Sequence, residues 1–248
     1  MIPLHDDNPT RRRPYVKYAL LAACAVVFFW QQGAADAAAQ AAVYAYGFIP
    51  AVFLGDAMLP DALNAPPAAL TPFTSMFLHG GWMHFLGNMA FLYVFGDNVE
   101  DAMSRWRFAL FYALCGAAAA AAQATLDLDS RIPMIGASGA IAGVLGAYLL
   151  LYPRARVLTL FPLGPIFFWK RLPAALLLTF WFGLQFVQQL TQSGDGGGVA
   201  YGAHIGGFVA GLILILIFKR RDVRLFAPAR PADPEPDAAP GRTARGGL

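Results

Sequence analysis

The sequence predicts an all-α membrane protein whose six transmembrane helices form a single bundle. Apolar residues make up 58% of the 248 residues and charged residues only 13%, about half the charged fraction of a soluble domain. Six uncharged stretches are each long enough for a helix that crosses a bilayer, which needs about 20 residues. This composition excludes an ordinary soluble globule, a disordered chain, a coiled coil and a nucleic-acid-binding protein.

The uncharged stretches and their breakers give the positions of the helices. The second helix begins late in its stretch, because Pro66, Pro67 and Pro72 break the earlier part. The expected helices span residues 16–33, 82–98, 107–125, 135–152, 172–192 and 200–218.

A seventh uncharged stretch, residues 37–55, contains Gly47 and Pro50 and is rich in alanine. With six helices and a cytoplasmic N-terminus, all of the 18 Lys and Arg residues except Arg131 lie in inner segments. The positive-inside rule favours this imbalance, and a seventh crossing would destroy it. We therefore expect residues 33–78 to form an outer loop.

The chain then divides into three parts. We expect residues 1–15 to be a cytoplasmic N-terminal segment, residues 16–218 the membrane domain, and residues 219–248 a disordered cytoplasmic tail. The tail is rich in Arg, Pro, Ala, Asp and Gly and has no hydrophobic period. A rival interpretation of residues 1–35 is a cleaved signal peptide, since Arg11–Arg13 precede an apolar run and small residues follow it. The sequence leaves this alternative open.

Three polar motifs lie within the expected helices, where a polar group is costly and therefore indicates function. His84 and Asn88 belong to the segment HGGWMHFLGN, and because they are four residues apart they share a helix face. Ser138 lies between small residues in GASG, and His204 lies in AHIGG. Each motif alone is also explained by helix packing, where small and polar residues are common.

The expected topology places these motifs at similar depth, because the second, fourth and sixth helices all run from outside to inside. At about 1.5 Å per residue, His84, Ser138 and His204 lie within about 10 Å of the outer ends of their helices. His204 is then a candidate base for the hydroxyl of Ser138. His84, Asn88 and the backbone N–H of Ser138 are candidate donors to an oxyanion. The nearest carboxylate, Asp195, lies in a glycine-rich loop, so we expect a Ser–His dyad.

These motifs resemble those of the rhomboid family of intramembrane serine proteases. The resemblance covers about residues 18–218 and rests on H-x4-H-x3-N, G-A-S-G and A-H-x-x-G in this order. It implies a six-helix bundle with a water-filled cavity open to the outer face, and hydrolysis of peptide bonds in or near transmembrane segments of substrates. In this resemblance Ser138 matches the nucleophile, His204 the base, and His84 and Asn88 the side-chain oxyanion donors.

Two departures from the family pattern concern the surroundings of this site. Some members carry an aromatic residue one turn after the serine, but Ala142 stands there, which leaves open what orients His204. Some members carry a Trp–Arg pair in the first loop, whereas residues 33–78 contain neither. Four glutamines near the outer end of the fifth helix either help to hydrate the cavity or form a solvated helix end, and we favour the solvated end: Gln185, Gln188, Gln189 and Gln192.

The leading hypothesis is an intramembrane serine endopeptidase that acts on transmembrane protein substrates in a lipid bilayer. The alternative is a non-catalytic rhomboid-like scaffold that binds transmembrane helices, although inactive relatives usually lack the serine or the histidine. A small transporter or channel is disfavoured, because the expected helices lack a membrane-buried charge.

We expect a multi-pass integral protein of a bacterial inner membrane with both termini in the cytoplasm. No cofactor, no metal ligand set and no nucleic-acid partner is predicted. The two cysteines, Cys24 and Cys115, lie in apolar runs and are expected to pack as small residues. The sequence leaves open the substrate and its cleavage site, the pathway, the oligomeric state and the turnover rate.

Overall fold

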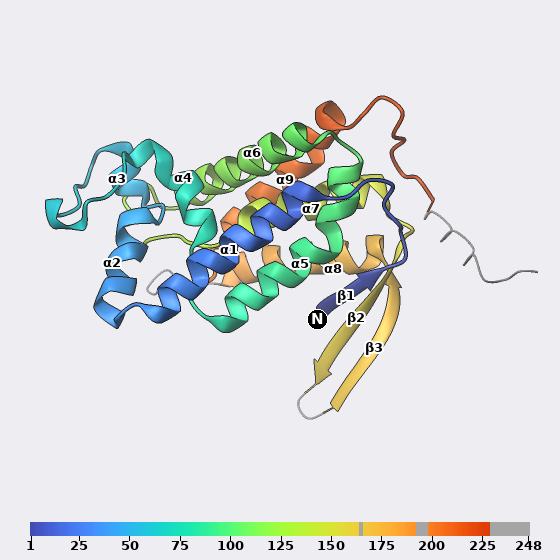
Figure 1. Cartoon of the computed structure of the whole chain (residues 1–248), viewed down its shortest axis with the longest axis horizontal. Helices are drawn as coiled ribbons and strands as arrows, with labels where there is room; N and C mark the ends of the chain where they lie inside the picture. Colours follow the sequence, from blue (N-terminus) through green and yellow to red (C-terminus); the bar gives the residue numbers. More distant parts are fainter. Residues whose placement is uncertain (164–165, 192–197, 229–248) are drawn as a thin grey trace, which may run out of the picture.

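The structure is a computed structural model that describes residues 1–163, 166–191 and 198–228, and it is mostly helical (Figure 1). Helices occur at all six positions expected from the sequence, and their ends differ from the expected ones by at most three residues. They are α1 (Tyr15–Gly33), α5 (Trp82–Asp101), α6 (Arg105–Ala124), α7 (Ser138–Leu151), α8 (Ala174–Thr191) and α9 (Tyr201–Phe218).

Four helices in the described part of the chain are long and apolar enough to cross a membrane, namely α1, α6, α8 and α9. α7 is apolar but has only 14 residues, and α5 carries Asp97, Glu100 and Asp101 near its end. The outward faces of the long helices expose large apolar side chains, such as Leu190 (72% exposed) and Ile217 (70% exposed). Such surfaces are typical of helices that face lipid, because soluble proteins rarely expose so large an apolar area to water.

Residues 33–78 form a compact group of short helices at one end of the bundle (Figure 1). No helix of spanning length occurs in residues 37–55, which the structure describes throughout. Phe48 and Met134 exchange backbone hydrogen bonds of 3.0 and 2.8 Å, which tie this group to the segment before α7. The short helices are α2 (Asp36–Tyr46), α3 (Pro50–Leu54) and α4 (Thr71–Thr74), with 3-10 turns η1 (Asp61–Leu63), η2 (Ala68–Leu70) and η3 (Ser75–Phe77).

An antiparallel sheet at the opposite end of the bundle departs from the predicted all-α fold (Figure 1). β1 (Ile2–Asp6) pairs with β2 (Arg156–Leu163), and β2 pairs with β3 (Ile166–Pro173). The all-α expectation is wrong here, because strands this short leave no signal of membrane-spanning length. Two runs rich in Val, Leu, Ile and Phe on either side of a Gly-Pro dipeptide are the sequence feature that indicates two paired strands.

Glycines allow α7 and α9 to pack backbone to backbone. A Cβ atom on Gly207 would overlap with the carbonyl oxygen of Gly139, and one on Gly211 would overlap with the carbonyl oxygen of Gly143. Only glycine fits at such contacts, which are typical of helix pairs in lipid. The packing holds the first turns of α7 and α9 against each other.

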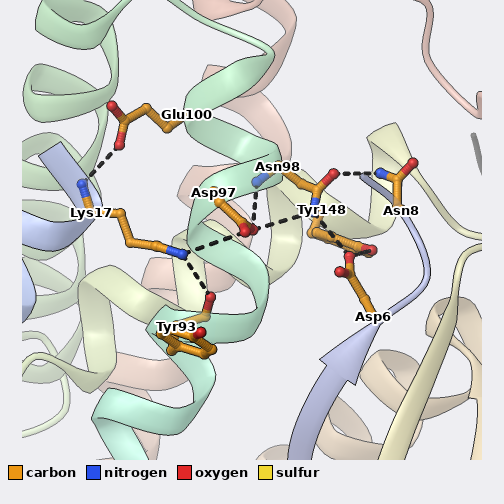
Figure 2. A network of polar contacts seen from close by, with 8 residues as sticks. All are labelled: Asp6, Asn8, Lys17, Tyr93, Asp97, Asn98, Glu100 and Tyr148. Atoms are coloured by element: carbon orange, nitrogen blue, oxygen red, sulfur yellow. Dashed lines mark hydrogen bonds and ion pairs between the residues drawn. The ribbon is translucent and has the colours of Figure 1, made fainter. Parts of the chain in front are cut away.

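A buried polar network ties the N-terminal segment to α5 and α7 (Figure 2). Asp6 accepts hydrogen bonds from the hydroxyl of Tyr148 and, at 3.0 Å, from Nδ2 of Asn98. Glu100 accepts hydrogen bonds from the backbone N–H groups of Val16 and Lys17 at 3.1 and 2.7 Å. These N–H groups are among the donors that the start of α1 leaves without helical partners. The network therefore fixes the sheet and the start of α1 to the bundle.

The expectation that the helices lack a buried charge is wrong, because Lys17 and Asp97 form an ion pair inside the bundle (Figure 2). Lys17 is 1% exposed, and its Nζ lies 3.4 Å from Oδ2 of Asp97 and 3.1 Å from the carbonyl oxygen of Tyr93. The two charges come from helices far apart in the sequence, so neither stretch alone reveals the pair. Both belong to the network that anchors α1, which gives them a structural role.

Asp6 makes the stability of this end of the molecule depend on pH. Burial raises the pKa of Asp6 from its usual 3.8 to about 7. Between about pH 4 and pH 7 the folded protein keeps a proton that the unfolded chain releases, so the free energy of unfolding falls as the pH rises. From pH 5 to pH 7.5 we expect wild type to lose about 2 kcal/mol more than Asp6→Asn.

Denaturant unfolding in mild detergent at the two pH values measures this difference. Asp56→Asn is the control, because the side chain of Asp56 is exposed, and its stability should follow the wild-type pH dependence. Parallel pH profiles for wild type and Asp6→Asn would contradict the prediction.

Candidate active site

The structure brings Ser138 and His204 within hydrogen-bond distance. Ser138 is the first residue of α7, and His204 lies in the first turn of α9. Nε2 of His204 lies 2.8 Å from Oγ of Ser138. His204 is 8% exposed, whereas Ser138 is only partly buried. The arrangement lets the imidazole accept the proton of the hydroxyl, on a serine that is not fully buried.

The other ring nitrogen of His204 faces α8. Nδ1 of His204 lies 2.6 Å from Oε1 of Gln185, which is 7% exposed. The indole of Trp181, one turn earlier on α8, lies 5.8 Å from the imidazole between ring centroids. The interpretation of Gln185 as part of a solvated helix end is therefore wrong, because its side chain is buried against His204.

The other three glutamines of the predicted solvated helix end differ in exposure or lie outside the described residues. Gln188 is exposed, as a solvated helix end requires, and Gln189 is partly buried. Gln192 and Asp195 lie outside the described residues. The spacing of Trp181 and Gln185 is the sequence feature that could have predicted their contact with His204, because residues four apart lie on the same face of a helix.

His84 and Asn88 lie one turn apart on α5, and both face the backbone that leads into α7. A Cβ atom on Gly136 would lie 2.6 Å from Nε2 of His84 and 3.7 Å from Nδ2 of Asn88. Gly136 has a φ of +121°, which side chains other than hydrogen rarely allow. The glycine therefore lets the chain pass close to both side chains two residues before Ser138.

The hydrogen bonds of His84 assign its ring proton. The backbone N–H of Gly80 donates to Nδ1 of His84 at 3.4 Å. Because Nδ1 accepts a hydrogen bond, the proton of the neutral ring is on Nε2. Nε2 is therefore a donor, and it is the ring nitrogen that faces Gly136.

Asn88 carries a buried donor without an acceptor among the described residues. Its Nδ2 is inaccessible to solvent and makes no hydrogen bond there. A buried donor without an acceptor destabilises the folded protein by about 1–3 kcal/mol. Such groups are rare, and a role in binding a reactant explains why one is present. The backbone N–H of Ser138 is also among those that a helix start leaves unpaired, and the helix dipole favours negative charge at that end. This side of Ser138 thus offers donors to an anion.

Contacts from neighbouring elements hold these groups in place. Oε1 of Gln123 on α6 accepts a hydrogen bond of 3.1 Å from the backbone N–H of Ala203, just before His204. The backbone N–H of Gly136 donates to the carbonyl oxygen of Ser75 at 2.9 Å. The site is therefore built by α5, α7, α8 and α9 with support from α6 and η3.

Comparison with known proteins identifies the family. The family model for the Rhomboid domain matches residues 68–221, more than half of the chain, including all of α5 to α9. The chain belongs to the rhomboid family. Because a rhomboid domain and apolar helices of spanning length occur together, this rhomboid protein is an integral membrane protein. The family membership that the sequence predicted is confirmed.

Two curated relatives of this rhomboid protein come from Arabidopsis thaliana. RHOMBOID-like protein 5 is 32% identical over 74 residues, which are 30% of this chain and 24% of the relative. Rhomboid-like protein 11, chloroplastic, is 26% identical over 158 residues, which are 59% of this chain and 51% of the relative. The chain thus matches about a quarter and about half of the lengths of these relatives.

Proposed function

We propose that this rhomboid protein is a serine endopeptidase that cleaves peptide bonds in or near transmembrane segments of other membrane proteins. The observation that carries the proposal is the 2.8 Å contact between Nε2 of His204 and Oγ of Ser138. A serine hydroxyl is a weak nucleophile unless a base removes its proton, and His204 is placed to do so. The unpaired donor of Asn88 supports the same function.

The proposed reaction has two stages. Oγ of Ser138 attacks the carbonyl carbon of the substrate as its proton moves to Nε2 of His204. The oxyanion that forms accepts hydrogen bonds from Asn88, His84 and the N–H of Ser138. His204 then gives its proton to the departing amine and leaves an ester on Ser138. A water molecule attacks the ester carbonyl as His204 takes its proton, and His204 then returns this proton to Oγ of Ser138 as the acyl–oxygen bond breaks and the new carboxylate leaves.

The length of α7 supports a reaction inside the membrane. Its 14 residues rise about 21 Å, less than the roughly 30 Å thickness of the hydrocarbon core. Its last residue, Leu151, lies close in sequence to β2, at the end of the bundle that carries the sheet. If that end lies at the cytoplasmic face, Ser138 lies below the outer surface, at the depth of a substrate's transmembrane segment.

We extend the proposal to topology and location. α1, α5, α6, α8 and α9 cross the membrane, α7 enters it from the cytoplasmic side and ends below the outer surface, and both termini lie in the cytoplasm. The basic residues of the inner segments favour this orientation. A bacterial inner membrane is the proposed location.

Cleavage in a defined membrane tests the proposed function. Purified protein in liposomes is mixed with a single-span membrane protein, and the products are identified by mass. We expect a cut within or beside the transmembrane segment. Binding of the single-span protein without any cut, across a panel of different transmembrane segments, would contradict the proposal and favour the scaffold that binds transmembrane helices.

Asn88→Ala is expected to lower kcat by roughly 10²–10³-fold with little change in KM, because an oxyanion donor acts mainly in the transition state. The variant should be at least as stable as wild type, since it removes a buried donor that lacks an acceptor. Steady-state kinetics and denaturant unfolding in detergent measure both effects.

Asn98→Ala on the same helix is the matched control for Asn88→Ala. Asn98 donates to Asp6 and accepts a hydrogen bond from Asn8, so its loss should lower stability while kcat per folded molecule stays within twofold of wild type. An Asn88→Ala variant that loses stability and keeps its kcat would contradict the assigned role.

A further inference from the structure

Gln185 is a buried amide in the second half of α8, where the other residues are exposed apart from the partly buried Gln189. The buried residues of α8 are Ala174, Leu177 and Leu178 near its start, and then Gln185. A polar side chain in such a place needs a hydrogen-bond partner, because an unpaired amide would be costly. That partner is Nδ1 of His204, 2.6 Å from Oε1 of Gln185.

The orientation of the Gln185 amide follows from its second contact. Nε2 of Gln185 donates to the carbonyl oxygen of Trp181 at 3.5 Å. The carbonyl oxygen accepts only, so it must meet the NH₂ end of the amide, which leaves Oε1 toward His204. Oε1 in turn accepts only, so Nδ1 of His204 carries the ring proton. Nε2 of His204 then presents its lone pair to Ser138, as a general base requires.

We propose that Gln185 is a positioning residue that holds His204 in the orientation and tautomer needed to deprotonate Ser138. This inference rests on the proposed function and names the group that orients the base where Ala142 supplies no aromatic ring. Trp181 contributes the ring that packs near the imidazole instead.

The arrangement differs from a triad with a carboxylate. When the proton of Ser138 reaches Nε2, the imidazolium keeps its Nδ1 proton and donates it to a neutral amide oxygen. No proton leaves Nδ1 at any step, and the amide stays neutral. Gln185 therefore fixes geometry more than it stabilises charge, so its removal should cost less than the loss of a triad carboxylate, which lowers kcat by about 10⁴-fold.

Kinetics of three variants test the proposal. Gln185→Leu removes the acceptor at similar volume, and we expect kcat to fall roughly 10- to 100-fold while KM changes less than twofold. Gln185→Glu keeps an acceptor at the same length and should recover most of that loss. Gln188→Leu, at an exposed position three residues along α8, should match wild type. A kcat for Gln185→Leu within twofold of wild type would overturn the proposal.

The tautomer of His204 gives a readout that needs no substrate. In protein with ¹⁵N-labelled histidine, the ring signals of His204 are assigned by their loss in His204→Ala. We expect the Nδ1–H tautomer in wild type and in Gln188→Leu, and a shift toward the Nε2–H tautomer in Gln185→Leu. An unchanged tautomer in Gln185→Leu would overturn the inference. If wild type cleaves no substrate, the proposed function fails, but this spectrum still decides what orients His204.

Discussion

Replacing Ser138 by alanine is expected to reduce peptide-bond cleavage by at least about 10³-fold, and His204→Ala should have the same effect. The hydroxyl and the imidazole act as one unit, because the oxygen attacks only as Nε2, 2.8 Å away, takes its proton. The double variant should therefore lose no more activity than either single variant, since removal of one member already abolishes the function of the other. Rates of substrate cleavage in liposomes measure all three.

The control for these variants is His5→Ala, because His5 lies in β1 with an exposed side chain and should keep wild-type activity. All variants should unfold at similar denaturant concentrations, which separates loss of chemistry from loss of folding. Equal cleavage by wild type, Ser138→Ala and His204→Ala would contradict the dyad and point to another nucleophile.

Gly207→Ala is expected to abolish cleavage and to destabilise the protein by about 3 kcal/mol or more. The added Cβ would overlap with the backbone carbonyl oxygen of Gly139, and no change of rotamer can relieve a clash between backbones. α9 must therefore move away from α7. Because Gly207 lies one turn after His204 and Gly139 directly follows Ser138, this movement separates the base from the nucleophile. Cleavage rates and unfolding in detergent measure the two effects.

Gly183→Ala is the matched control for this steric effect. A Cβ on Gly183 in α8 would meet no atom within 4 Å, so the variant should keep its activity. Its stability should stay the same or rise by up to about 1 kcal/mol, because alanine favours the helix. A Gly207→Ala variant with more than half of the wild-type activity would show that close packing of α7 and α9 is not required.

The parts of the structure that follow from local sequence patterns were predictable. Uncharged stretches long enough to cross a bilayer predicted the positions of six helices. The prediction works because charged residues are excluded from lipid over about 20 consecutive residues. The motifs around His84, Ser138 and His204 indicated the candidate site, because polar residues are rare in membrane-spanning segments. The structure places Ser138 next to His204 and both His84 and Asn88 against Gly136.

The parts that depend on pairing between distant segments were not predictable. The charge of Lys17 is paired with that of Asp97 on another helix. β1 pairs with β2, which is about 150 residues later in the chain. In the sequence, Gln185 is one of several glutamines near the end of a helix. Its role depends on which face of α8 packs against α9, and the sequence does not give that face. Burial separates Gln185 from Gln188, and burial is a property of the packed bundle.

Covalent labelling with a fluorophosphonate tests the central claim, that His204 activates Ser138 as a nucleophile. Such a probe phosphonylates an activated serine with loss of fluoride, and the adduct is located by mass spectrometry of peptides from protein labelled in liposomes. We expect an adduct on Ser138 in wild type, no adduct in Ser138→Ala, and labelling of His204→Ala at least about 10²-fold slower. Labelling of Ser138 at the same rate in wild type and His204→Ala, or adducts only on other residues, would contradict it.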